Sequence, residues 1–184
     1  MATERAKKTA ASWSDLKAKL LDFDRAGMLA LVQDMYAANK ENQAFLHARF
    51  GLGADTLKPY KSTISRWLWP DICRGQDTSI SKAKQAITDY KKAVGRLEDM
   101  VELMTYYCEQ AAGFSNEVAL SDEGYFGSLL LMFAQVLKLA AGLTPAERGA
   151  LLPRLDHVRR ISHSFGYGVG DEMDELLDQY QVQD

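Results

Sequence analysis

Apolar residues recur along most of this chain at intervals of three and four, the spacing that places them on one side of an α-helix. The clearest stripe follows Asp24 and consists of Met28, Leu31, Val32, Met35 and Tyr36. No segment alternates apolar and polar residues as a half-buried strand does, and no Asn-Gly or Asp-Gly hairpin turn occurs. The sequence therefore predicts an all-α fold.

Capping residues and helix breakers divide the chain into about eight or nine helices. The clearest start is at Thr144, where Pro145 takes the first helical position and Glu147 completes a capping box. Gly95 is placed to end a helix, and Pro153 is expected to kink or split the helix that contains it. The expected helices lie at 14–21, behind Asp24, at 41–50, between Asp55 and Pro70, at 79–94, from Leu97, at 126–140, from Thr144 and at 171–180.

The segment 126–140 is apolar nearly all round, so we expect it at the centre of a stack of helical hairpins, with Leu130 and Phe133 buried. The longest apolar run, Leu129 to Leu143, is interrupted by polar residues and is shorter than the ~20 residues that a membrane span needs, so we expect no membrane partner. Residues 13–184 are expected to form a single helical domain behind a disordered tail at 1–12.

Charge is divided unevenly along the chain. Residues 1–96 contain seventeen Lys and Arg against ten Asp and Glu, whereas residues 97–184 contain five against fifteen, although the net charge is only −3. Within the domain, 13–96 is thus a basic half and 97–184 an acidic half. Two surfaces of opposite sign are predicted, which favours a protein partner or head-to-tail self-association.

Several blocks in the middle of the chain resemble the signature blocks of an uncharacterised bacterial family, a domain of unknown function. They comprise Ser81–Lys92, Leu103–Glu109, Phe114–Glu117, Ser121–Glu123 and the later Gly166-Tyr167-Gly168. The resemblance covers roughly residues 79–175. It implies a small helical fold and a cytoplasmic protein of bacterial origin, and it implies no activity.

The residues that most often ligate metals do not form a recognisable site. Glu109, Glu117, Asp122 and Glu123 are close in sequence and could hold Mg²⁺ or Ca²⁺, but Asp122 and Glu123 suit a helix N-terminus equally well. His157 and His163 are six residues apart, which turns them to different sides of a straight helix. The glycines at 166–170 follow no strand, so they favour a joint between helices over a phosphate loop. We expect no metal and no cofactor.

No catalytic motif occurs, so an enzymatic site would have to be assembled in space from separate helices. Tyr, Lys and Glu side chains on helices could serve as acid, base and anchor if they met in one cleft. The candidates for such a site, or for ligand contact, are Tyr90, Lys91, Tyr106, Glu109, Asn116 and Glu117.

The basic half interleaves cations with aromatic residues, as nucleic-acid-binding surfaces do. Its candidate face consists of Lys58, Lys61, Arg66, Lys84, Lys91 and Lys92, of which we expect the last three to be solvated. We expect a non-catalytic interaction module that binds a protein partner or itself. A nucleic-acid-binding protein and a spatially assembled enzyme are the alternatives. The unpaired Cys73 and Cys108, and the lack of a secretory pattern after the N-terminus, favour the cytoplasm.

Overall fold

The computed structural model describes residues 11–182, and within this range it contains nine α-helices, one short 3₁₀ helix and no strand. The predicted all-α fold is confirmed. The chain divides into two compact units with the boundary between Gln43 and Ala44. Among the described residues, every buried hydrophobic side chain lies in the larger, C-terminal unit.

The smaller unit contains α1 (Trp13–Leu20), α2 (Arg25–Ala38) and the beginning of α3 (Lys40–Phe50). Asp24 caps α2 as predicted, because its carboxylate accepts a hydrogen bond from the backbone N–H of Gly27 at 2.7 Å. A capping box of Ser12 and Asp15 begins α1. No residue of α1 or α2 is buried, so these helices cover little of each other's apolar surface.

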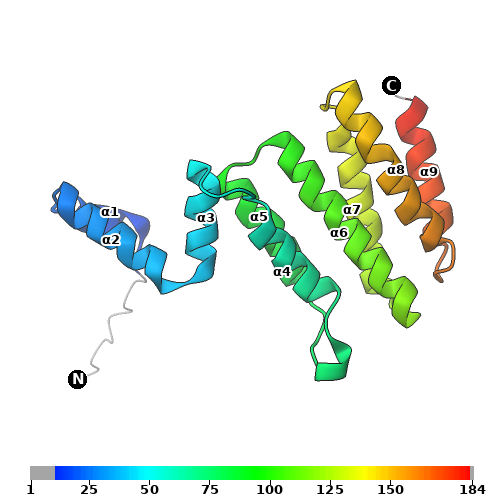
Figure 1. Ribbon diagram of the computed structural model, residues 1–184, viewed down its shortest axis with the longest axis horizontal. Coiled ribbons are helices and arrows are strands. Elements are labelled where there is room, and N and C mark those ends of the chain that lie inside the picture. Colours follow the sequence, from blue (N-terminus) through cyan, green and yellow to red (C-terminus); the bar gives the residue numbers. More distant parts are fainter. Residues whose placement is uncertain (1–10, 183–184) are drawn as a thin grey trace, which may run out of the picture. The chain divides into compact units, whose positions relative to one another are not determined.

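The larger unit continues from α3 through six further α-helices (Figure 1). They are α4 (Lys58–Leu68), α5 (Ile80–Ala93), α6 (Leu97–Val118), α7 (Glu123–Ala140), α8 (Pro145–Ser162) and α9 (Val169–Val182), with a 3₁₀ turn at Ile72–Arg74 between α4 and α5. Consecutive helices pack in pairs, α4 with α5, α6 with α7 and α8 with α9. This is the predicted arrangement of stacked helical hairpins.

Local sequence signals fix most helix ends in this unit. Thr144 and Glu147 form the predicted capping box at the start of α8. Asp122 accepts a hydrogen bond from the N–H of Tyr125 at 2.9 Å, which caps α7. The backbone of Gly95 has a φ of 70°, and a Cβ there would lie 2.8 Å from the carbonyl oxygen of Lys91. Only glycine fits that position, which explains why α5 ends there.

Two helices supply most of the core. In α7, Phe133 is fully buried and Leu130 is 9% exposed, as predicted. α6 contacts the largest number of neighbours among the helices of this unit, since it packs against α4, α5, α7 and α8. Figure 1 shows α7, α8 and α9 gathered beside α6. The core therefore extends from α4 to α9 across α6.

Pro153 does not divide α8, which runs without interruption from Pro145 to Ser162. Proline removes one backbone N–H and crowds the carbonyl four residues earlier, so the sequence predicts a kink or a break there. Pro153 lies on the exposed side of α8, and the residue four positions earlier is Gly149, which is also exposed and would have open space around a Cβ. Water can solvate the freed carbonyl on that side, and the helix continues.

The remaining expectations about chain organisation are only partly addressed by the described residues. The disordered tail expected at 1–12 lies outside the described residues for positions 1–10, while Ser12 caps α1. The single domain expected over 13–184 stays a prediction. No helix among residues 11–182 is both long enough and apolar enough to cross a membrane.

The burial of α7 leads to a stability prediction. Phe133→Ala should lower the free energy of unfolding by about 3 to 5 kcal/mol, because it leaves a cavity in a fully buried site. Leu131→Ala in the same helix is the matched control, since Leu131 is 63% exposed and its loss should cost less than ~1 kcal/mol. Urea denaturation followed by circular dichroism measures both, and equal effects would contradict the buried position of Phe133.

Candidate functional site

The six residues proposed as an enzymatic or ligand site differ in burial and in the contacts that they make. Tyr90 is fully buried, and Lys91, at the following position of α5, is exposed. Asn116 and Glu117 are both exposed near the end of α6. Only Tyr106 and Glu109 belong to one group of contacts, described next. The contacts described for these residues do not join all six side chains, and the site stays a prediction.

A cluster of four charged side chains, the α4–α6–α8 ion cluster, connects three helices of the larger unit. Its members are Lys61, Glu102, Glu109 and Arg154. Arg154 of α8 donates to both oxygens of Glu109 at 2.7 and 2.8 Å and also to Glu102, while Lys61 of α4 lies 2.6 Å from Glu102. About 30% of each side chain is exposed, so the ion pairs are only partly screened by water.

The ion cluster contains two cations and two carboxylates, and the cations lower the pKa of Glu102. Partial burial alone raises the pKa of Glu102, but hydrogen bonds from Arg154 and Lys61 outweigh it and hold that pKa below its ordinary value of 4.5. Lys61 also lies 5.4 Å from the centre of the Tyr106 ring. Each cation thus has a carboxylate partner, which indicates a structural connection between helices and leaves no unpaired base in the cluster for catalysis.

Tyr90 takes part in a second polar group at the junction of α5 and α6. Its hydroxyl donates a short hydrogen bond to Asp99, which Arg96 also contacts at 2.7 Å. Burial and this bond raise the pKa of Tyr90 to about 12. The ring of Tyr60 packs edge-on against Tyr90, with centroids 5.2 Å apart, and the Tyr60 hydroxyl is buried without a hydrogen-bond partner among the described residues. Tyr90 therefore orients the turn between two helices and cannot readily release a proton.

The predicted basic face is partly neutralised by contacts within the chain. Lys61 belongs to the ion cluster, and Lys92 lies 3.4 Å from Asp89. Arg66 donates to the backbone oxygen of Asp77 at 3.4 Å. The remaining members differ in exposure, with Lys58 and Lys91 exposed and Lys84 half-buried. Of the three lysines predicted to be solvated, Lys91 and Lys92 are exposed, and Lys84 is only partly so.

The aromatic residues among these cations have structural contacts. Lys82 and Arg66 lie 3.9 and 4.4 Å from the centre of the half-buried Trp67 ring. The ring of Trp69 occupies the space beside Gly113 of α6, where a Cβ would come within 2.4 Å of it. Bases stack on aromatic faces that are free. Two cations contact the ring of Trp67, and Trp69 packs on α6 although it is 36% exposed, so neither ring is wholly free for stacking.

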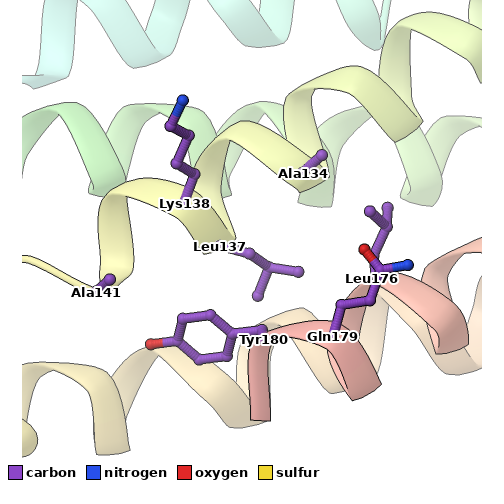
Figure 2. Close-up of a pocket in the computed structure, with 7 residues that line it drawn as sticks. All are labelled: Ala134, Leu137, Lys138, Ala141, Leu176, Gln179 and Tyr180. Carbon is purple, nitrogen blue, oxygen red and sulfur yellow. The ribbon is translucent and has the colours of Figure 1, made fainter. Parts of the chain in front are cut away.

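A groove with a volume of about 360 Å³ lies between α7 and α9. Ala134, Leu137 and Leu176 form its apolar lining, and Tyr180 closes one side. Figure 2 shows the Tyr180 ring extending from α9 beneath Leu137, while Lys138 points away from that ring. The Tyr180 hydroxyl is buried without a hydrogen-bond partner among the described residues. A single buried hydroxyl beside an apolar lining does not define a reaction.

The most extensive apolar exposure lies in the smaller unit. We call it the N-terminal apolar surface and define it by Trp13, Leu16, Leu21, Phe23, Met28, Leu29, Val32 and Met35. Their exposed fractions run from 40% for Met28 to 78% for Leu21. Of the stripe predicted on α2, Leu31 and Tyr36 are half-buried and the other three residues belong to this surface.

Comparisons with known proteins add no family assignment. No family model matches the chain, and no curated protein and no solved structure shows significant similarity to it. The resemblance to a bacterial family of unknown function over residues 79–175 therefore stays a prediction. Function must be inferred from the contacts themselves.

The ion cluster yields a pH-dependent stability prediction. Arg154→Met should lower the free energy of unfolding at pH 7 by about 1 to 3 kcal/mol, because it leaves Glu102 and Glu109 partly buried without their shared cation. The depressed pKa of Glu102 stabilises the fold above pH ~4.5, and this contribution is lost as pH falls through the pKa of the folded state. Wild type and variant should therefore converge in stability in acid.

Arg160→Met in the same helix serves as the control for Arg154→Met. Arg160 is 62% exposed and forms an ion pair with Asp156, so its loss should change the free energy of unfolding by less than ~1 kcal/mol. Urea titrations at pH 7 and pH 3 measure both variants. A difference between Arg154→Met and wild type that is the same at both pH values would contradict an electrostatic role.

Proposed function

We propose that the protein is a non-catalytic interaction module that binds a second copy of itself through the N-terminal apolar surface. The observation that carries this proposal is the exposure of eight large apolar side chains on α1, α2 and the turn between them. Contiguous exposed apolar residues typically mark sites that bind another protein, and Met28, Val32 and Met35 recur at helical spacing on one side of α2.

Physical stability also calls for a partner at this surface. α1 and α2 contain 8 and 14 residues and bury none of them. Isolated helices of this length are marginal in water, and most helix stability in proteins comes from packing an apolar side against a neighbour. A partner that covers α1 and α2 supplies that packing. Binding and helix stability are then coupled, as in any association that buries a weakly folded element.

A second copy is the partner that the charges favour. The described residues of the smaller unit, 11–43, contain five acidic and four basic side chains. Two such nearly neutral units do not repel each other, and neither selects a strongly charged partner. Self-complementary apolar patches commonly form two-fold interfaces, and four helices around one core are a stable arrangement.

The contacts favour this role over the two alternatives. Cations of the predicted basic face are engaged by Glu102, Asp89 and backbone oxygen, which weakens the case for nucleic acid. The six residues suggested for an enzyme share no common contact among the described residues. Both alternatives stay predictions, as do head-to-tail contact of basic and acidic surfaces, bacterial origin and a cytoplasmic location.

The proposal predicts the oligomeric state of the full chain. Sedimentation velocity from micromolar concentrations upward should show a monomer–dimer equilibrium. Leu29→Glu combined with Val32→Glu should shift it to monomer, with at least a roughly tenfold weaker association, because two carboxylates would have to be desolvated in the interface. Ala30→Glu combined with Ala37→Glu is the matched control, since it places two carboxylates at exposed positions on the other side of α2 from Val32 and should leave the dimer intact.

The outcomes of this experiment are distinct. A wild-type chain that stays monomeric at all concentrations overturns self-association. The apolar surface would then contact another part of the same chain or a different protein. Equal weakening by the variant with Ala30→Glu and Ala37→Glu would assign the effect to the added negative charge and not to the apolar surface. Circular dichroism as a function of concentration gives an independent measurement, because dilution of the wild type should lower helix content as the dimer dissociates.

A further inference from the structure

The joint between α8 and α9 brings a histidine and two aspartates together. His163 stands at the C-terminal end of α8, and Asp171 and Asp174 lie three residues apart in the first turns of α9. One ligand atom from each side chain can be chosen so that all three lie within 4.8 Å of one another. The closest contacts are 3.2 Å between His163 Nε2 and Asp174 and 3.6 Å between His163 Nδ1 and Asp171.

The glycine-containing turn accounts for this approach. Tyr167 and Gly168 both have positive φ, which reverses the chain between the two helices. At Gly170, a Cβ would lie 2.5 Å from His163 Nδ1, so the imidazole rests directly on a residue that has no side chain. The turn therefore holds the imidazole against the start of α9, within reach of both carboxylates.

The charges of α9 favour a cation at this place. The helix contains five carboxylates and no Lys or Arg between Val169 and Val182. Arg159 is the neighbouring positive side chain, and it donates to Asp174 Oδ1 at 2.6 Å while also contacting Asp156. Both oxygens of Asp174 lie near His163 Nε2, with Oδ2 at 3.2 Å and Oδ1 at 3.4 Å, and only Oδ1 also accepts from Arg159. Arg159 thus orients the carboxylate in the way that hydrogen-bonding partners orient metal ligands.

We propose that His163, Asp171 and Asp174 bind a divalent transition metal ion, with Zn²⁺ as the best match. An imidazole nitrogen disfavours Mg²⁺ and Ca²⁺, whereas one nitrogen and two carboxylate oxygens suit Zn²⁺ with water in the fourth position. Zinc–ligand bonds of about 2.0 to 2.1 Å place tetrahedral ligands about 3.3 Å apart. Asp171 and Asp174 face different nitrogens of the imidazole, so one side chain must turn for a single nitrogen to share the ion with both carboxylates. The three side chains are 39%, 84% and 40% exposed, which leaves room for that rotation.

Bound zinc would join the end of α8 to the beginning of α9. The two helices already pack against each other, and Val169 and Met173 of α9 are fully buried. Ligation by His163 from one helix and two aspartates from the other therefore adds a cross-link to a surface that is otherwise joined by ion pairs. Zinc should raise the melting temperature of the chain as well as bind to it.

Isothermal titration calorimetry of the full chain with ZnCl₂ tests this proposal. One Zn²⁺ per chain is expected, with a dissociation constant in the micromolar range, and an excess of Mg²⁺ should not displace it. His163→Ala should weaken binding by roughly tenfold or more. Asp171→Asn should do the same without unfolding the protein, because Asp171 is highly exposed and the substitution preserves its shape.

Two control variants separate this site from other zinc ligands. His157→Ala removes an exposed histidine of the same helix, and Cys73→Ser removes the exposed thiol, and both should bind zinc as the wild type does. Equal zinc affinity in wild type, His163→Ala and Asp171→Asn would overturn the proposal, as would loss of binding in either control. Zinc binding that leaves the melting temperature unchanged would contradict the cross-link between α8 and α9.

Discussion

The larger unit depends on a helix that is buried on two sides. α6 packs against α4 and α5 on one side and against α7 and α8 on the other, so its apolar residues serve two interfaces at once. A helix in this position has little surface left for charged groups. Glu102 and Glu109 nevertheless lie on it, and they are accommodated there because Lys61 and Arg154 reach them from the helices on either side. The packing of α6 between its neighbours and the pairing of its two glutamates in the ion cluster therefore depend on each other.

Much of the fold could be predicted from the sequence because helix ends are local events. Asp24, Thr144 and Gly95 act on backbone groups within four residues of themselves, and each acts as predicted. The burial of Phe133 was predictable because segment 126–140 is apolar on most sides, although α7 keeps an exposed side that carries Leu131, Gln135 and Lys138. Pro153 shows the limit of local rules, because its effect depends on which side of α8 faces water.

The contacts that connect distant segments could not be predicted in the same way. Lys61 and Glu102 are 41 residues apart, and Arg154 and Glu109 are 45 apart, so nothing in their spacing indicates that they pair. The division of charge along the sequence predicts two surfaces of opposite sign for this reason. In the structure, some of these basic and acidic residues form ion pairs with each other inside the larger unit. The apolar stripe of α2 likewise predicts a covered side. The sequence pattern marks such a stripe but does not say which chain covers it.

The cluster of His163, Asp171 and Asp174 could not be predicted from sequence spacing, because a turn of the chain brings its members together. His163 and Asp171 are eight residues apart across a reversal of the chain, and helical periodicity relates neither to the other. This cluster also differs from the α4–α6–α8 ion cluster in its balance of positive and negative side chains. Lys61 and Arg154 balance the acids of α6, but α9 has no basic residue of its own, and Arg159 of α8 is the cation that reaches Asp174.

The apolar surface of the smaller unit is nearly neutral and lies on different helices from the histidine and aspartates. Its binding energy would come from removing apolar side chains from water, which depends little on salt or metal. Cation binding at the start of α9 would come from charge and from ligand geometry, which depend on both. Association through the apolar surface and cation binding on α9 thus arise from separate residues and separate forces, and either can be absent without affecting the other.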